Sequence, residues 1–279
     1  MHEATGRSKA GGAASAAVVA LAIAGAAPAI AQPKTTEEGI EQYREMLQDG
    51  NPADLNAMKG AGLWTQPRGP KNASLEKCDI GLGPGVVKGA YAQLPRYFAD
   101  VDQVMDFESR LVHCMVTLQG FDREKLVAKP FSGGGQPATD IENIVAYVTD
   151  ESRGEKVALP QDHPKEKEAA LRGEKMFFYR AGPYDFSCAS CHSNEGQRIR
   201  LQGLPNLTKP EPAQKAFTTW PAYRVSQGAL RTMQWRIYDC FRQQRFPELK
   251  YLSPASIDLI TYLGVKGKGG TMDAPAIKR

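Results

Sequence analysis

Hydrophobic residues recur at helical spacing in several parts of the chain. Residues 165–180, KEKEAALRGEKMFFYR, combine helix-forming residues with an apolar stripe, and a glycine and a proline end the pattern. Residues 229–243 and residues 253–264, SPASIDLITYLG, are also predicted helices, the latter with a serine cap and a proline in its first turn. Sustained alternation of hydrophobic and polar residues, which is typical of strands, is absent from the sequence. The pattern therefore predicts an all-α fold.

Two stretches rich in glycine, proline and polar residues interrupt the helical pattern. They are FSGGGQPATD, residues 131–140, and PNLTKPEPAQK, residues 205–215. Glycine and proline favour turns and disfavour the interior of a helix. Both stretches are therefore predicted to be loops.

Short segments of the first half of the chain recur, in the same order, in the second half. Any one match is weak, but the shared order makes chance similarity a poor explanation. The matches also place Cys78 opposite Cys188. The four matched pairs are MKGAGLW (58–64) with LRGEKMF (171–177), LPRY (94–97) with WPAY (220–223), SRLVHC (109–114) with WRIYDC (235–240), and NIVAYV (143–148) with DLITYL (258–263).

The distance between matched segments drifts from 110 to 126 residues, as expected when the loops between equivalent helices differ in length. The sequence therefore predicts two related domains of similar size in tandem. Their boundary is placed in ESRGEKVALPQDH, residues 151–163, which gives a first domain at residues 32–152 and a second at residues 153–279.

The first 31 residues have the features of a secretory signal peptide. Arg7 and Lys9 precede an apolar stretch rich in alanine and glycine, and Ala29 and Ala31 form an AxA cleavage site. The alternative is a membrane anchor, but the apolar run is shorter than the roughly 20 residues that span a bilayer. No later segment of the sequence is long or apolar enough to do so. The mature protein is therefore predicted to be soluble, outside the cytoplasm and free of the membrane.

Removal of residues 1–31 lowers the formal charge of the chain from +4 to +3. This mild balance, without a basic run that carries interleaved aromatic residues, argues against nucleic acid as a partner. The hydrophobic content of 42% is that of a globular protein and excludes overall disorder.

The strongest local signal is SCASCH, residues 187–192, which contains Cys188, Cys191 and His192 at CxxCH spacing. This is the spacing of covalent c-type heme attachment. Two thiols add to the two vinyl groups of one porphyrin, and the adjacent histidine becomes an axial ligand of the iron. The alternatives are a redox CxxC, which needs a βαβ setting, and half of a zinc site, which needs a second ligand pair. Covalently bound heme c is therefore predicted.

The first half lacks the matching heme chemistry. With Cys78 aligned to the first heme cysteine, Gly81 and Leu82 stand where the second cysteine and the histidine would be. Cys78 and Cys114 then have no porphyrin to hold and, in an oxidising compartment, are expected to form a disulfide with each other. The two cysteines are 36 residues apart. In the chain-entropy model such a disulfide stabilises the protein by roughly 3–4 kcal/mol.

This assignment leaves Cys240 as the one cysteine without a partner. Arg236 precedes it by four residues in a predicted helix, so both side chains project from one face, where a guanidinium favours the thiolate and suits anions with several oxygens. The alternative is a buried structural cysteine with an arginine on the surface. Arg110 and Cys114 repeat the pair in the first half, which suggests an original role beside a heme. The simplest such role is the sixth ligand of the iron.

Other residue types that ligate heme iron also occur, but none of them belongs to a motif. Met233 and Met272 are possible ligands in an ordinary electron-transfer cytochrome, although Met233 fits a helix core as well. His113 and His163 are candidates by residue type alone, and surface or structural roles are favoured for them. The tryptophans are predicted to line the core or the heme pocket; they are Trp64, Trp220 and Trp235.

CASCH, followed by WPAYR at residues 220–224 and then by RIYDC, resembles the SoxA family, the larger subunits of the SoxAX cytochromes of bacterial thiosulfate oxidation. The resemblance covers essentially the whole mature chain, and its combination of CxxCH with a downstream RIxxC is specific among c-type cytochromes. It implies a periplasmic L-cysteine S-thiosulfotransferase, which joins thiosulfate oxidatively to a cysteine of the carrier protein SoxYZ. It also implies a partner subunit, SoxX, whose heme receives the two electrons.

The resemblance further implies a role for each matching residue. Cys188 and Cys191 would hold the heme covalently, and His192 and Cys240 would be its axial ligands. Cys240 would also carry a persulfide and be the catalytic residue, with Arg236 binding the anionic substrate. The missing motif of the first half would place the chain in the one-heme branch of the family.

Two other functions are compatible with the same residues. One is a plain periplasmic electron-transfer c-type cytochrome with histidine and methionine ligation, in which Cys240 is inert. The other is a scaffold that docks a partner through the first half. Thiolate ligation of the oxidised heme would favour the thiosulfotransferase over the electron carrier. Full activity after replacement of Cys240 would favour the scaffold.

Overall fold

The computed structural model describes residues 35–47, 50–199 and 202–278. The predicted signal peptide lies outside the described residues. Among the helices that are described, none is both long and apolar enough to cross a bilayer.

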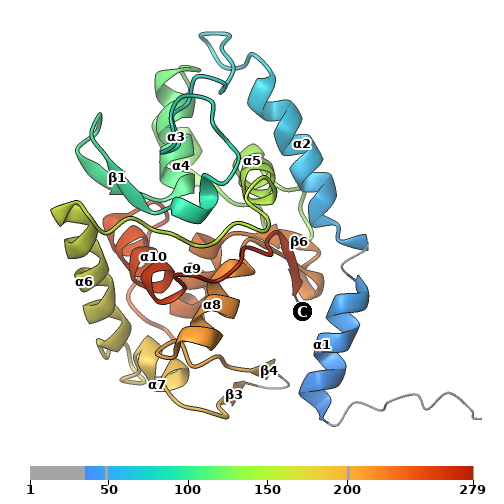
Figure 1. The fold of residues 1–279 in the computed structure, drawn as a ribbon, viewed down its shortest axis with the longest axis vertical. Coiled ribbons are helices and arrows are strands. Elements are labelled where there is room, and N and C mark those ends of the chain that lie inside the picture. The colour runs from blue at the N-terminus through green and yellow to red at the C-terminus, as the bar shows by residue number, and fades with distance from the viewer. Residues whose placement is uncertain (1–34, 48–49, 200–201, 279) are drawn as a thin grey trace, which may run out of the picture.

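Helices dominate the described chain (Figure 1). The α-helices are α1 (Thr36–Leu47), α2 (Ala53–Thr65), α3 (Phe107–Thr117), α4 (Arg123–Ala128), α5 (Asp140–Asp150), α6 (Pro164–Phe178), α7 (Cys188–His192), α8 (Pro210–Thr218), α9 (Met233–Gln243) and α10 (Pro254–Lys266). Short 3-10 helices cover Tyr91–Gln93 and Val225–Gln227. The strands are β1 (Arg96–Phe98), β2 (Gln103–Met105), β3 (Arg198–Ile199), β4 (Gln202–Gly203), β5 (Ala222–Arg224), β6 (Ala229–Arg231) and β7 (Ala276–Lys278).

The all-α prediction is wrong in one respect, because the described residues also form small sheets. β1 pairs with β2 and β3 with β4, each antiparallel, while β5 lies between antiparallel β6 and parallel β7. These strands are at most three residues long, too short for alternation to be detected in the sequence. The helix predicted over residues 229–243 accordingly begins only at Met233, since residues 229–231 form β6.

The predicted loop at residues 205–215 is only partly a loop, because α8 begins at Pro210. Pro210 and Pro212 both lie in the first turn of the helix, where backbone N–H groups have no intrahelical partner and their loss carries no penalty. The start of α10 agrees with the prediction. The side chain of Ser253 accepts a hydrogen bond from a backbone N–H three residues later, and Pro254 is the first helical residue.

Each half contains a helix pair that crosses at one glycine. α2 packs against α5 in the first half, and α6 packs against α10 in the second (Figure 1). A β-carbon at Gly60 would overlap the carbonyl oxygen of Asn143 and lie 2.8 Å from the β-carbon of the tyrosine four residues later. A β-carbon at Gly173 would likewise overlap the carbonyl oxygen of Asp258 and lie 2.8 Å from the β-carbon of Tyr262. Both contacts match residue for residue in the predicted repeat.

Gly60→Ala is expected to lower the free energy of unfolding by about 3 kcal/mol, because α2 and α5 must move apart to admit a methyl group. Gly62→Ala is the matched control in the same helix, since nothing lies within 4 Å of a β-carbon there. Alanine is the better helix former, so this control should gain up to about 1 kcal/mol. Chemical denaturation followed by circular dichroism measures both changes. Equal effects of the two substitutions would contradict the close crossing.

The halves also share a strand, strand and helix in the same order. β1 and β5 each follow a cis proline, Pro95 in the first half and Pro221 in the second. The side chains of Asp106 and Thr232 then cap α3 and α9, each accepting a hydrogen bond from the N–H three residues later. The repeat predicted from the sequence is therefore present in the backbone as well.

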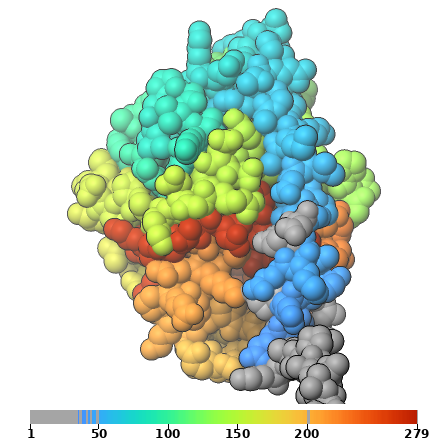
Figure 2. All heavy atoms as spheres, turned by 45° about the vertical axis from the view of Figure 1, so that its right-hand side comes forward, coloured from blue at the N-terminus to red at the C-terminus, as the bar shows by residue number. Residues whose placement is uncertain are grey.

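The two halves share one continuous hydrophobic core, which includes Phe107 from the first half and Phe217 from the second. The C-terminal residues lie between the halves and form the red band in Figure 2. The backbone of these residues is hydrogen-bonded to the segment that connects the halves, where the N–H of Gly154 donates to the carbonyl of Met272 at 2.8 Å. The boundary predicted at residues 151–163 falls between α5 and α6. The division into two domains stays a prediction, because the core continues across it.

Candidate functional site

The predicted heme motif forms one short helix, α7, which packs against α6. Ser187 and Ser190 set its start. The Ser187 hydroxyl accepts a hydrogen bond from the backbone N–H of Ser190, and the Ser190 hydroxyl accepts one from the N–H of Ser187. This reciprocal cap begins the helix at Cys188. Both motif cysteines and the histidine are therefore held within little more than one helical turn.

His192 is oriented by the segment that follows α7. Its Nδ1 lies 2.9 Å from the carbonyl oxygen of Pro205. A carbonyl oxygen can only accept, so Nδ1 donates and Nε2 carries the lone pair. Burial lowers the pKa of His192, the hydrogen bond to Pro205 raises it, and the charge of Arg236 lowers it. The side chain is thus suited to ligate a metal through Nε2.

Cys240 lies near the end of α9, one turn beyond Arg236, and both side chains are half-buried. Nη1 of Arg236 lies 3.6 Å from a carboxylate oxygen of Asp239. Asp239 also accepts hydrogen bonds from Arg242 at 2.8 Å and from Gln243 at 2.6 Å. A guanidinium has five N–H donors, and this contact at 3.6 Å involves one nitrogen, so Arg236 retains capacity for a further anion.

The motif cysteines and Cys240 lie close enough together for each to affect the pKa of another. Burial raises the pKa of Cys188 to about 12, with the nearby Cys240 and Cys191 adding to the shift. Burial also raises the pKa of Cys240, and the cations of Arg236 and Arg224 oppose this rise. α7 and α9 therefore bring the predicted heme-binding residues and the predicted catalytic residue into a single site.

The donor set of this site fits a heme c. Cys188 and Cys191 are free thiols three residues apart on α7, as the CxxCH motif of covalent heme attachment requires, and Nε2 of His192 is suited to ligate the iron. Cys240, also a free thiol, lies on a different helix and could supply a further ligand. The structure thus brings together the residues assigned to the heme in the sequence.

Cys78 and Cys114 form the predicted disulfide, with their Cα atoms 5.7 Å apart. In this half Gly81 stands at the position of Cys191, and it packs against an arginine side chain. Arg96 lies against Gly81 and donates from Nη1 to its carbonyl oxygen at 2.5 Å. A β-carbon at Gly81 would come 2.5 Å from Cδ of Arg96, and the φ of 113° is one that other residues rarely adopt.

A pocket of about 460 Å³ lies beside this disulfide. Arg110, the equivalent of Arg236, borders it, but its guanidinium is already engaged. Nε donates to the carbonyl oxygen of Asp79 at 2.6 Å, and Nη1 donates to the carboxylate of Asp100 at 2.7 Å. The first half therefore keeps the arginine and cysteine pair. Its arginine is paired with an aspartate, and its cysteine is part of the disulfide.

The other candidate ligands have structural surroundings. His163 caps α6 through Nδ1, and its ring stacks on Tyr97 with centroids 3.6 Å apart. His113 lies 3.7 Å from an aspartate carboxylate. Met233 and Met272 are buried in the shared core. The tryptophans Trp64 and Trp220 are buried in that core, and Trp235 packs against it.

The sequence analysis missed one charged residue of the site. Arg224, the last residue of β5, is a second cation that opposes the raised pKa of Cys240. In the repeat, Phe98 of the first half stands at the position of Arg224. This difference between the halves could have identified Arg224 from the sequence, because the arginine occurs only in the half that keeps a free cysteine.

Comparison with known proteins gives consistent matches. The family described as SoxA/TsdA, cytochrome c domain, matches residues 59–157 and 172–272. The chain is 56% identical over 242 residues to the L-cysteine S-thiosulfotransferase subunit SoxA of Hydrogenophilus thermoluteolus, with 87% of this chain and 88% of that protein covered. A subunit of the same name from Hydrogenobacter thermophilus is 34% identical over 255 residues, with 90% and 92% covered.

Among solved structures, SoxXA from P. pantotrophus matches with a TM-score of 0.70 and 22% identity. The match covers 85% of this chain and 84% of that chain. At this identity the comparison establishes a shared fold.

Proposed function

Because the chain belongs to the SoxA/TsdA cytochrome c domain family, we propose that it is the SoxA-type catalytic subunit of an L-cysteine S-thiosulfotransferase. Relatives with this name align over most of their length. One observation supports the proposal most strongly. α7 and α9 bring a CxxCH motif together with a free cysteine that has an arginine one turn before it.

In this proposal the chain holds one heme c. Cys188 and Cys191 would form the two thioether bonds, and His192 and Cys240 would be the axial ligands. When bound, the heme supplies an electron-accepting centre beside the Cys240 sulfur. The first half would hold none, because its two cysteines are joined to each other.

The proposed reaction joins the outer sulfur of thiosulfate to a cysteine thiol of SoxYZ. A sulfur–sulfur bond forms, the thiol proton leaves, and two electrons leave one at a time, each reducing an oxidised heme of SoxX. Cys240 would carry a persulfide, whose outer sulfur bonds to the outer sulfur of thiosulfate as these electrons leave. The SoxYZ thiolate would then displace the persulfide and take over the bond to thiosulfate, which regenerates the persulfide on Cys240. Arg236 and Arg224 would offset the negative charge of thiosulfate.

The proposal also covers location and assembly. The protein would act in the periplasm after removal of residues 1–31, as a heterodimer with SoxX. The shared fold with a SoxXA protein supports such a partner. Residues 32–152 would be a degenerate cytochrome domain without heme, and residues 153–279 would carry the heme and the active site.

Arg236→Met tests the function and this residue together. The substitution is expected to lower kcat/KM for thiosulfate by roughly 10- to 100-fold, the effect of losing one charge-assisted hydrogen bond to an anion. The assay follows thiosulfate-dependent reduction of the SoxX heme by the holoprotein in the presence of reduced SoxYZ.

Arg242→Met is the matched control for this substitution. Arg242 lies on the same helix, its side chain is 61% exposed, and it pairs with the same aspartate as Arg236. Its replacement should change kcat/KM by no more than about twofold. Equal losses in both variants would contradict a substrate-binding role for Arg236. Absence of turnover in the wild type would refute the proposed function.

A further inference from the structure

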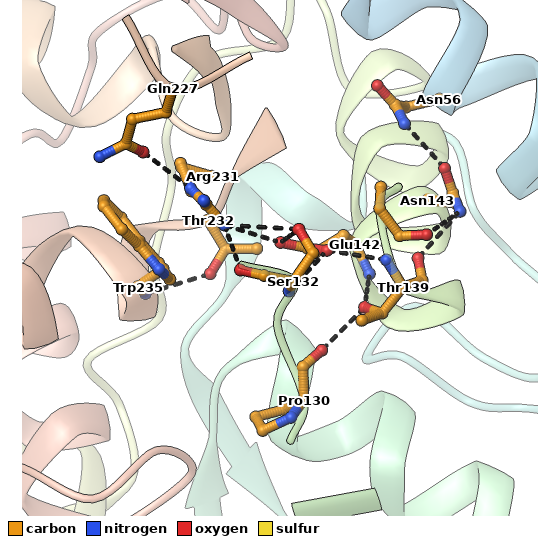
Figure 3. A network of polar contacts seen from close by, with 11 residues as sticks. Asn56, Pro130, Ser132, Thr139, Glu142, Asn143, Gln227, Arg231, Thr232 and Trp235 are labelled. Carbon is orange, nitrogen blue, oxygen red and sulfur yellow. Dashed lines mark hydrogen bonds and ion pairs between the residues drawn. The ribbon is translucent and has the colours of Figure 1, made fainter. Parts of the chain in front are cut away.

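The start of α9 is anchored by buried polar side chains of the first half (Figure 3). Arg231 ends β6, and Thr232 caps α9, whose later turns carry Arg236 and Cys240. The side chain of Arg231 is only 2% exposed. A buried cation is stable only when it is paired and hydrogen-bonded, so its contacts indicate what holds this part of the chain.

Four groups surround the Arg231 guanidinium (Figure 3). Nε donates to Oε1 of Gln227 at 2.8 Å, and Nη1 donates to the backbone carbonyl of Ser132 at 2.6 Å. Nη1 also lies 3.6 Å from Oε1 of Glu142. Cζ lies 4.3 Å from the ring centroid of Trp235, which belongs to α9. Arg231 therefore joins the β5–β6 connection and the first turn of α9 to two residues of the first half.

Glu142 contributes the opposite charge from α5. Its carboxylate is fully buried and accepts hydrogen bonds from the backbone N–H groups of Ser132 at 3.1 Å and Thr139 at 2.8 Å. Burial raises the pKa of Glu142, while these hydrogen bonds and Arg231 lower it. Arginine stays protonated in proteins. The two side chains thus form a buried ion pair between the halves, in which loss of one partner leaves the other uncompensated.

Two further contacts hold the same turn of α9. Nε2 of Gln234 donates to Oδ2 of Asp106 at 2.5 Å. The side chain of Thr232 lies close enough to that of the buried Glu108 to lower its pKa, which burial raises. Asp106 and Glu108 lie at the start of α3, the helix of the first half that is equivalent to α9. The first turn of α9 is thus fixed by the first half at several points.

The residues that the repeat makes equivalent to Arg231 and Glu142 do not form a second ion pair between the halves. In the repeat, Met105 stands at the position of Arg231, and Ile257 stands at the position of Glu142. A contact needed only for the shared fold would be expected in both halves. The pair instead occurs at the helix that carries a free cysteine, which points to a role at the site.

We propose that Arg231 is a positioning residue that fixes the direction of α9 and thereby the place of Arg236 and Cys240 against α7. Nine residues separate Arg231 from Cys240, about 13 Å along a helix, so a tilt of ~5° at its start moves the Cys240 sulfur by ~1 Å. A displacement of that size costs up to about 100-fold in rate. The effect on activity rests on the proposed function, whereas the effect on α9 does not.

The test compares Arg231→Met and Glu142→Gln with the wild type, all as heme-loaded protein. Hydrogen exchange should become faster in α9 by roughly tenfold, with exchange in α6 and α7 unchanged. In the SoxYZ assay kcat should fall by roughly 10- to 100-fold, while KM for thiosulfate changes less than about threefold. Arg231→Lys keeps the charge without the planar fork and should lie between the wild type and Arg231→Met. If Arg231→Met fails to fold, Glu142→Gln, which preserves side-chain volume, carries the test.

Arg172→Met is the matched control. Arg172 forms a two-point ion pair with Asp258 at 2.7 and 2.9 Å, which joins α6 to α10 within the second half. Its loss should lower the melting temperature without faster exchange in α9 and without a fall in kcat. The proposal is overturned if Arg231→Met and Glu142→Gln lower the melting temperature but leave α9 exchange and kcat at wild-type values. Faster α9 exchange in these variants, with no thiosulfate activity in the wild type, would support the positioning role and refute the proposed function.

Discussion

Cys240→Ala is expected to abolish the conjugation of thiosulfate to SoxYZ. Of the free cysteines in the described residues, Cys240 alone is not assigned to heme attachment, so no other thiol is available to carry the persulfide that binds thiosulfate. kcat should fall by about 10³-fold or more, as when an enzyme loses its covalent nucleophile. The assay is the thiosulfate-dependent reduction of SoxX with SoxYZ present. Intact mass of the non-reduced protein should show one extra sulfur atom on the wild type that the variant lacks.

Heme content separates the loss of chemistry from a failure of assembly. Cys188, Cys191 and His192 are untouched in this variant, so intact mass should still report one covalent heme. The oxidised spectrum should lose the signature of thiolate ligation. Full activity of Cys240→Ala would instead make the protein a scaffold. A methionine-to-iron signature in the wild type would make it an electron carrier.

Removal of the disulfide by Cys78→Ala together with Cys114→Ala is expected to cause the largest loss of stability. The bond joins residues 36 apart in sequence. Its loss should lower the free energy of unfolding by roughly 3–4 kcal/mol because the unfolded chain gains freedom. For a protein of this size the melting temperature should fall by about 10 °C. Thermal unfolding followed by circular dichroism measures the change.

The wild type in a strong reductant is the control for this pair of substitutions, and it should melt near the temperature of the double variant. Well below that temperature the double variant should retain its heme and most of its activity, because the disulfide lies in the half without the proposed active site. A wild-type melting temperature in the double variant would show that the disulfide does not constrain the unfolded chain. Loss of covalent heme would contradict the separation of the two roles.

The parts of the site that lie within a few helical turns could be predicted from the sequence. The CxxCH motif needs only the short helix α7, and the pairing of Arg236 with Cys240 needs only one turn of α9. The internal repeat also allowed one contact between distant residues to be predicted. It indicated that Cys78 and Cys114 had no heme to hold, and the structure confirms the disulfide between them.

Contacts that depend on the packing of distant segments could not be predicted. Arg231 and Ser132 are 99 residues apart, and neither belongs to a recognisable motif. Arg224 was within a quoted segment, but its effect on Cys240 depends on where β5 lies relative to α9. Strands of two or three residues leave no measurable period. Prolines at the start of α8 resemble a loop until the helix that follows them is seen.

Gly81 bears on the descent of the protein. If the first half comes from a domain that bound its own heme, more has changed than the two ligand side chains. The loop at Gly81 now has a backbone conformation that suits glycine, and Arg96 occupies the space that a side chain there would need. A mutation that restored cysteine at this position would therefore be harmful until Arg96 and the loop had also changed. If the proposed single heme is correct, restoring a second heme by one substitution at a time would be opposed at the first step.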